Sequence, residues 1–212
     1  RSITTKEFQA LMKATKETTA SSPSGIHMGH YVWGSTVQDI EEVFARMASL
    51  PFVHGFAPSR WKQSIHVMLE KIPGCPRVDK LRIIQLMEAD MNAVLKIIVG
   101  RKLMWRAEAS GAFGEEMHGS RQGRTAHDGL FSQCLLMEVW RMAKLEGVNF
   151  NMDAMKCFDR IRPQLATINM ARLGMGKNVG VCMAKVFRNM THRVSTVFGV
   201  SSKWVKQVGS SL

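Results

Sequence analysis

The sequence predicts an α+β protein that contains more helix than strand. Three observations indicate this class: several stretches place apolar residues at helical spacing, shorter stretches alternate apolar and polar residues, and no internal repeat separates them. The chain has 212 residues, of which 45% are hydrophobic and 22% are charged. It is therefore long enough for one domain with a substantial core, and its composition differs from that of a disordered protein.

The N-terminal part is expected to be helical with one interruption. Residues 6–18 carry apolar side chains at helical spacing, and the Ser- and Gly-rich residues 19–34 then break the pattern. Residues 38–50 again place apolar side chains on one helical face. We expect Pro51 to stop this second helix.

A β-hairpin is expected next. Residues 64–69 alternate between apolar and polar side chains, a Pro- and Gly-containing turn covers residues 73–76, and residues 81–86 can return as the second strand. The two arms carry Lys71 and Arg82. Two cations on one hairpin can face one anion.

The clearest helical periodicity lies in residues 88–106 and 125–146, and Gly147 is expected to end the second of these helices. The period then changes to two, so residues 148–153 predict a strand with one apolar and one polar face. Two further helices and a strand at residues 193–200 complete the predicted elements.

The charge balance points to a polyanionic partner. Lys and Arg number 29 against 17 Asp and Glu, a net charge of +12, and residues 151–212 supply +8 of it with ten basic and two acidic residues. Nucleic acid is the first candidate and an acidic membrane surface the second. A solvated basic face explains the charge equally well.

Other features bound the location of the protein. Lys96 interrupts the most apolar stretch and the N-terminus lacks a secretory signal, so we expect an intracellular protein without a membrane span. The four cysteines lie far apart without Cys-x-x-Cys spacing, which favours reduced thiols over a zinc site or disulfides. Because the chain begins with Arg, we expect it to be a fragment.

A carboxylate at the end of a predicted strand is the most informative chemical feature. Asp153 ends the alternating segment, and Phe158 and Asp159 follow it. A carboxylate fixed at a strand end suits Mg²⁺, which takes one or two carboxylates together with phosphate oxygens and water. An Asp that caps the following turn is the alternative, and on these residues alone it is favoured.

Residues 149–161 resemble the first catalytic palm motif of reverse transcriptases, hydrophobic-Asp-x-x-x-x-Phe-Asp-x-Ile/Val. Further blocks resemble those of LINE-type, or non-LTR, retrotransposon enzymes in the same order, so that the resemblance covers most of residues 21–212. These blocks are residues 22–31, 61–73, 81–86, 92–103 and 119–128.

The resemblance implies a partial reverse transcriptase domain over residues 1–212, with fingers to about residue 147 and the N-terminal palm over residues 148–212. It implies RNA-directed DNA polymerase activity with two Mg²⁺ ions, an RNA template, a DNA primer and dNTP, in the nucleus or the cytoplasm. No Asp follows Asp159, so the aromatic-x-Asp-Asp motif of the family is missing. With one of three metal carboxylates, the fragment is expected to be inactive alone and truncated before the palm is complete.

The resemblance also assigns roles near the metal ions. Asp153 would be the catalytic, metal-binding aspartate, and the carbonyl of Ala154 would be a second metal ligand. Phe158 would lie beneath the incoming sugar and select dNTP over NTP. A core aromatic is the alternative for Phe158.

Four basic residues receive binding roles from the same resemblance. Lys71 and Arg82 would grip the triphosphate, Arg82 with a bidentate fork and Lys71 with a point charge. An exposed loop lysine is the alternative for Lys71. Arg121 and Arg124 would hold the template backbone, whereas His127 and Asp128 are expected to cap or anchor the helix that follows.

Two other functions compete with the polymerase. A decayed, non-catalytic relative would only bind RNA or an RNA–DNA hybrid through its basic face, and a helical binding module unrelated to polymerases is a third possibility. Nucleic-acid binding is expected to be sensitive to salt and independent of sequence. His27 and His30 have His-x-x-His spacing, for which loop packing or a phosphate contact is favoured over a metal.

Overall fold

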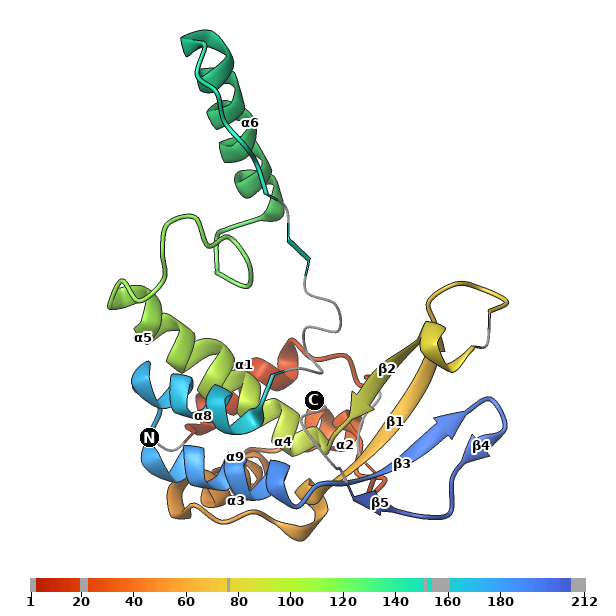
Figure 1. Cartoon of the computed structure of the whole chain (residues 1–212). Coiled ribbons are helices and arrows are strands. Elements are labelled where there is room, and N and C mark those ends of the chain that lie inside the picture. The colour runs from red at the N-terminus through yellow and green to blue at the C-terminus, as the bar shows by residue number, and fades with distance from the viewer. Residues whose placement is uncertain (1–2, 20–22, 76, 151, 154–160, 207–212) are drawn as a thin grey trace.

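The computed structural model describes residues 3–19, 23–75, 77–150, 152–153 and 161–206. Over these residues the chain is α+β, as the sequence predicts, with a group of helices beside a small sheet (Figure 1). The α-helices are α1 (Thr5–Lys13), α2 (Met28–Gly34), α3 (Gln38–His54), α4 (Ala89–Leu95), α5 (Met104–Ala109), α6 (Ala126–Ala143), α8 (Pro163–Arg172) and α9 (Lys177–Arg188).

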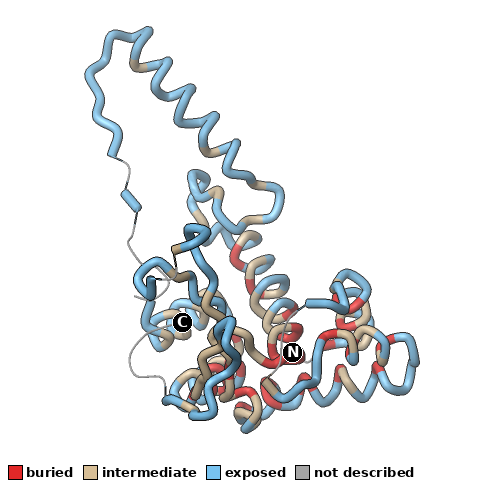
Figure 2. Tube along the Cα trace, turned by 90° about the vertical axis from the view of Figure 1, so that its right-hand side faces the viewer, coloured by how far each residue is buried: buried red, intermediate tan, exposed pale blue. Residues whose placement is uncertain are grey.

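The hydrophobic core lies among the helices, and Figure 2 shows the buried residues gathered there. Helices α1, α3, α4 and α9 each turn an apolar face toward it. The start of α1 is fixed by a capping box, because the Thr4 hydroxyl accepts a hydrogen bond from the Glu7 N–H and the Glu7 carboxylate accepts one from the Thr4 N–H. The largest fully buried apolar side chains are Trp61, Phe8, Met12, Met28, Met91, Ile97, Met190, Val94 and Val186.

The sheet has the order β2-β1-β3-β4, with β5 also paired to β3. Strands β1 and β2 are antiparallel from the pair Ile65 and Leu86 to the pair Glu70 and Leu81, which confirms the predicted hairpin. Strands β1 and β3 are parallel, so the chain must cross the helical layer between them. The strands are β1 (Gln63–Glu70), β2 (Leu81–Leu86), β3 (Thr191–Thr196), β4 (Gly199–Val200) and β5 (Val205–Lys206).

The strand predicted at residues 193–200 is instead a hairpin. Strands β3 and β4 pair antiparallel, with Thr196 opposite Gly199. Gly199 has φ of +120°, which an L side chain rarely adopts, and this conformation permits the tight reversal.

The helix predicted at residues 88–106 forms, and it runs continuously from Ala89 to Ala109. Its middle part, η3 (Lys96–Leu103), is a π-helix between α4 and α5. A π-helix bonds each N–H to the carbonyl five residues earlier and so widens the turn. The apolar face that predicted the helix packs on the core, and its residues Met91, Val94 and Leu103 are buried.

Pro51 does not stop α3, contrary to the prediction. The helix continues to His54 and ends at Gly55, which has φ of +68°. The turn after Pro51 buries Phe52, whose ring lies 5.3 Å from the ring of Trp61. Burial of this aromatic pair offsets the hydrogen bond that Pro51 cannot donate.

Residues 19–34, predicted as a loop, contain the short helix α2. Tyr31 anchors it, because its ring lies 5.0 Å from the ring of Phe44 and 6.4 Å from that of Phe8. Helix α2 has only seven residues, too few to show a helical periodicity in the sequence. The packing of Met28 and Tyr31 therefore decides this helix.

Helix α6 ends earlier than predicted. Lys144, with φ of +52°, ends it after Ala143, and Gly147 does not serve as its C′ residue. Gly147 lies against the ring of Trp140, where a Cβ would come within 2.4 Å of a ring carbon. A larger residue at position 147 would therefore require the Trp140 ring to move.

The strand predicted at residues 148–153 does not form over the residues described there, which are all but Asn151. Phe150 is 84% exposed and Met152 is 95% exposed. Alternation describes a half-buried strand only when a neighbouring strand and a packed face are present. The described strand β1 already has β2 and β3 as its two partners.

Two stacked imidazoles join β1 to β3. The rings of His66 and His192 lie 4.2 Å apart with an interplanar angle of 6°, and Gln85 and Val194 lie opposite His66 on the neighbouring strands. Burial lowers the pKa of His66 below its usual value, and the nearby charge of His192 lowers it further. The folded state therefore disfavours protonated His66.

Stability is expected to fall as the pH is lowered through about 6.5, because the unfolded chain binds a proton at His66 more readily than the folded chain does. Replacement His66→Gln is expected to reduce the difference in free energy of unfolding between pH 7 and pH 5, measured by urea denaturation. The exposed His127→Gln is the control and should leave this difference unchanged. An identical pH dependence in His66→Gln and the unaltered chain would contradict the assignment.

Candidate functional site

The β1–β2 hairpin carries an exposed cationic face. Lys71 follows the last residue of β1, and its N–H donates to the carbonyl of Lys80, at the end of the short 3₁₀-helix η2 (Val78–Lys80). Arg82 lies in β2 opposite Leu69. Leu69 and Lys71 are two residues apart, and side chains at that spacing share one face of an extended chain. Residues opposite each other on paired strands also share a face, so Lys71 and Arg82 lie on the same face of the hairpin.

The register brings a third cation to this end of the hairpin. Lys80 lies across from Lys71, and like Lys71 and Arg82 it is exposed. The sequence pattern does not mark Lys80, because only the register of the two arms places it there. Three cations on one exposed hairpin face attract a ligand with several negative charges.

The three cations form no ion pair with a carboxylate among the residues that the structure describes. Arg77, in the same loop, is different: its Nε lies 3.1 Å from Oδ1 of Asp79. The hairpin therefore contains both a neutralised arginine and cations that remain available. Arg82 can offer two parallel N–H groups to a phosphate, and each lysine offers a point charge.

A buried ion network holds the base of this hairpin. Arg60 precedes β1 in the 3₁₀-helix η1 (Ser59–Lys62), and Glu88 and Asp90 follow β2. The Arg60 guanidinium donates to Glu88 at 3.0 Å and to Oδ1 of Asp90 at 2.8 Å, and it also pairs with Oδ2 of Asp90. The side chain of Glu88 is fully buried and that of Asp90 is 4% exposed.

Further donors complete the network around the two carboxylates. Ser24 donates to Glu88 from its N–H at 3.0 Å and from its hydroxyl at 2.8 Å. The Trp61 indole N–H donates to Asp90 at 3.0 Å. Burial, and then the charge of Asp90, raises the pKa of Tyr31 to about 12, so this phenol stays protonated beside the network.

Asp153, the predicted catalytic residue, has an exposed side chain and lies outside the strands of the described sheet. Ala154, predicted to supply a metal ligand, and Phe158, predicted to contact the sugar, lie outside the described residues. Among the described residues no three His, Cys, Asp or Glu side chains gather as a metal-binding group. A two-ion site needs several carboxylates, so the donor set that the structure describes does not by itself fit two Mg²⁺ ions.

Arg121, predicted to contact the template, forms its hydrogen bonds within the protein. Its Nε and Nη2 each lie 2.7 Å from a carboxylate oxygen of Glu108, and its Nη1 donates to the carbonyls of Gly114 and Met117. Its side chain is only 9% exposed. This geometry favours a structural role, in which Arg121 ties the loop after α5 back to that helix.

Arg124 and Asp128 lie at the start of α6. Arg124 donates to the carbonyl of Glu115 at 3.0 Å and stays partly exposed, so it retains donors for a phosphate. Asp128 forms a capping box with Thr125, which confirms its predicted capping role. The hydrogen bond from the Thr125 hydroxyl lowers the pKa of Asp128.

His27 and His30 interact with each other locally. The His27 N–H donates to Nδ1 of His30 at 3.1 Å, and the two rings stack 6.2 Å apart. This hydrogen bond uses a ring nitrogen of His30 and satisfies a donor at the start of α2. This contact agrees with loop packing, one of the two interpretations favoured over a metal site.

Three cysteines, Cys75, Cys134 and Cys182, are free thiols, and Cys157 lies outside the described residues. Burial raises the pKa of Cys182 to about 12.

Within the described ranges, none of the helices is long and apolar enough to span a lipid bilayer. Comparison with protein-family models gives no match, and comparison with curated proteins gives none either.

Replacement Arg60→Ala is expected to reduce the free energy of unfolding by about 3 kcal/mol, because it leaves two buried carboxylates without their cation. The matched control is Arg46→Ala, which removes an exposed pair with Glu42 and should cost less than about 1 kcal/mol. Urea denaturation at pH 7 measures both. Equal losses in the two variants would show that the network does not stabilise the hairpin base.

Proposed function

We propose that the chain forms the fingers and the N-terminal palm of an RNA-directed DNA polymerase of the LINE type. In this proposal the hairpin formed by β1 and β2 binds the triphosphate of a dNTP. The observation that carries the proposal is the exposed face that Lys71, Lys80 and Arg82 share without a neutralising carboxylate among the described residues.

The arrangement of the hairpin supports a binding role rather than a purely structural one. Its tip is exposed and cationic, whereas its base is fixed by the ion pairs of Arg60 with the buried carboxylates of Glu88 and Asp90. A rigid base lowers the entropy lost when a charged tip binds a ligand. The order of the sequence blocks that resemble the polymerase family supports the same assignment.

Asp153 is proposed as one metal ligand of this polymerase. Its exposed carboxylate leaves both oxygens accessible. Further carboxylates would be required beside Asp153 to hold two Mg²⁺ ions. The contribution of the described residues is to bind and orient the triphosphate.

A second candidate function is nucleic-acid binding without catalysis. The observation that favours it is the excess of exposed cations in the C-terminal part: Arg162, Arg172, Lys177, Arg188, Lys203 and Lys206 are all exposed. Such a surface binds RNA or an RNA–DNA hybrid through phosphate contacts. This function needs neither the hairpin cations nor Asp153.

Binding of dNTP distinguishes the two functions. Replacement of both Lys71 and Arg82 by Ala is expected to lower the affinity for a fluorescent dNTP at least about 10-fold, because charge-assisted hydrogen bonds to phosphate are lost. Titration by fluorescence anisotropy at low salt measures the affinity.

Arg77→Ala is the matched control, since Arg77 lies in the same hairpin loop but pairs with Asp79. Its affinity for dNTP should stay within about twofold of the unaltered chain. If the unaltered chain binds RNA but no dNTP, the polymerase proposal fails and the binding function remains.

Asp153→Asn is expected to abolish primer extension in a protein that also carries the further metal carboxylates, while template binding stays nearly unchanged. The substitution removes a negative charge and little volume. Extension of a labelled primer on an RNA template and filter binding of that template measure the two properties. Full extension by this variant would remove Asp153 from the metal site.

A further inference from the structure

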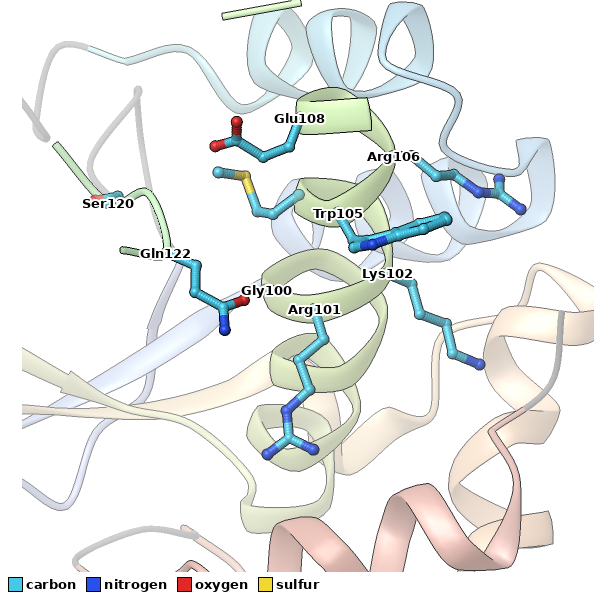
Figure 3. Close-up of a pocket in the computed structure, with 9 residues that line it drawn as sticks. Gly100, Arg101, Lys102, Trp105, Arg106, Glu108, Ser120 and Gln122 are labelled. Atoms are coloured by element: carbon cyan, nitrogen blue, oxygen red, sulfur yellow. The ribbon is translucent and has the colours of Figure 1, made fainter. Parts of the chain in front are cut away.

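A hollow of about 860 Å³ lies beside the helix formed by η3 and α5 (Figure 3). The helix contributes Gly100, Arg101 and Trp105 to one side of it. The loop after α5 contributes Ser120 and Gln122 from the other side, and Figure 3 shows the Gln122 side chain pointing toward Gly100.

Trp105 is the largest exposed side chain of this surface. It is 71% exposed, although tryptophan is usually well buried. Trp61, by comparison, is 1% exposed and donates its indole N–H to Asp90. No ring contact or hydrogen bond to Trp105 occurs among the described residues, so its ring face is available for stacking.

Basic residues dominate the helix before and immediately after Trp105. The segment from Lys96 to Arg106 contains four basic residues and no acidic one. Arg101, one helical turn before Trp105, is exposed, and Arg106, the next residue, is exposed as well. Arg106 uses one donor weakly, at 3.4 Å from the carbonyl of Gly174, and retains the others.

The acidic residue in the lining of the hollow is already paired with an arginine. Glu108 lines the hollow, but both of its oxygens accept hydrogen bonds from Arg121 at 2.7 Å. The hydrogen bond with Arg121 lowers the pKa of Glu108, which keeps the pair ionised and matched. The surface therefore presents an exposed indole between two arginines, and the Glu108 carboxylate is already occupied by Arg121.

We infer that this surface, the Trp105 surface (Arg101, Trp105, Arg106 and Gln122), binds single-stranded nucleic acid by stacking one base on the indole. The two arginines would contact the adjacent phosphates, and the amide of Gln122 can hydrogen-bond a base edge. An aromatic platform flanked by cations suits a strand whose bases are unpaired, because a base within a duplex has no free face.

The inference does not depend on the polymerase proposal. It uses none of the hairpin cations and does not use Asp153, and it names a contact that the basic C-terminal part does not supply. A chain that fails to bind dNTP can still bind a single strand here. The reverse also holds, so the two proposals fail in different experiments.

The test is the affinity of the unaltered chain and of Trp105→Ala for a fluorescently labelled ten-nucleotide oligoadenylate, measured by anisotropy. Trp105→Ala is expected to weaken binding between about 5-fold and about 150-fold, the range for loss of one stacked base. An abasic ribose-phosphate strand of the same length should bind both proteins equally. Parallel titrations with the ribo- and deoxyribo-oligomers identify which single strand the surface prefers. The loss of affinity in Trp105→Ala is expected for the oligomer that binds the unaltered chain more tightly.

Two variants separate stacking from structural damage. Trp105→Phe keeps an aromatic face and should recover most of the affinity that Trp105→Ala loses. Trp33→Ala removes another exposed tryptophan, which is 67% exposed on α2 and bonded to Glu17, and should leave binding unchanged. Replacement of Arg101 and Arg106 by Gln should reduce the slope of log affinity against log salt by about one per residue.

Three results would each overturn the inference. The first is equal affinity of Trp105→Ala and Trp33→Ala for the oligoadenylate, and the second is equal affinity of the unaltered chain for the abasic strand and the oligoadenylate. The third is displacement of the oligoadenylate by polyglutamate as readily as by unlabelled oligoadenylate. The last result would mean that an acidic peptide satisfies this surface through charge alone.

Discussion

The arrangement of this protein depends on one buried ion network. Arg60 lies just before the first strand of the hairpin, Glu88 and Asp90 lie just after the second, and Ser24 joins the loop before α2 to the same carboxylates. Two buried carboxylates are tolerated only because a guanidinium, an indole, a hydroxyl and backbone N–H groups satisfy them together. The network thereby fixes the sheet against the helical core, and it leaves the far end of the hairpin exposed.

Carboxylate partners divide the basic residues into two groups. Arg60 and Arg121 are bound to acidic residues and carbonyls and hold the fold together. Lys71, Arg82 and Arg101 are exposed and form no ion pair among the described residues. A net charge of +12 therefore does not mark every arginine as a ligand contact. The available cations, rather than the total, define where a polyanion can bind.

Helix α6 is maintained by local interactions. Its capping box, formed by Thr125 and Asp128, and the pair of Glu138 with Arg141 lie within its own sequence, and it contains no buried residue (Figure 2). Apolar side chains such as Phe131, 64% exposed, and Met142, 76% exposed, therefore contribute little hydrophobic stabilisation. The cooperative part of the molecule is the helical core together with the sheet, because that is where apolar surface is removed from water.

The sequence by itself determined the α+β class, the β1–β2 hairpin, the long helix from Ala89 to Ala109 and the cap at Asp128, because these depend on periodicity and on neighbours in the chain. Tertiary packing decided the rest. The core allowed α3 to continue through Pro51, the lack of a paired neighbour among the described strands left residues 148–150 irregular, and Glu108 removed Arg121 from the set of available cations. The hollow beside Trp105 is likewise a result of tertiary structure, because the loop after α5 brings Ser120 and Gln122 to the helix from a distance in the sequence.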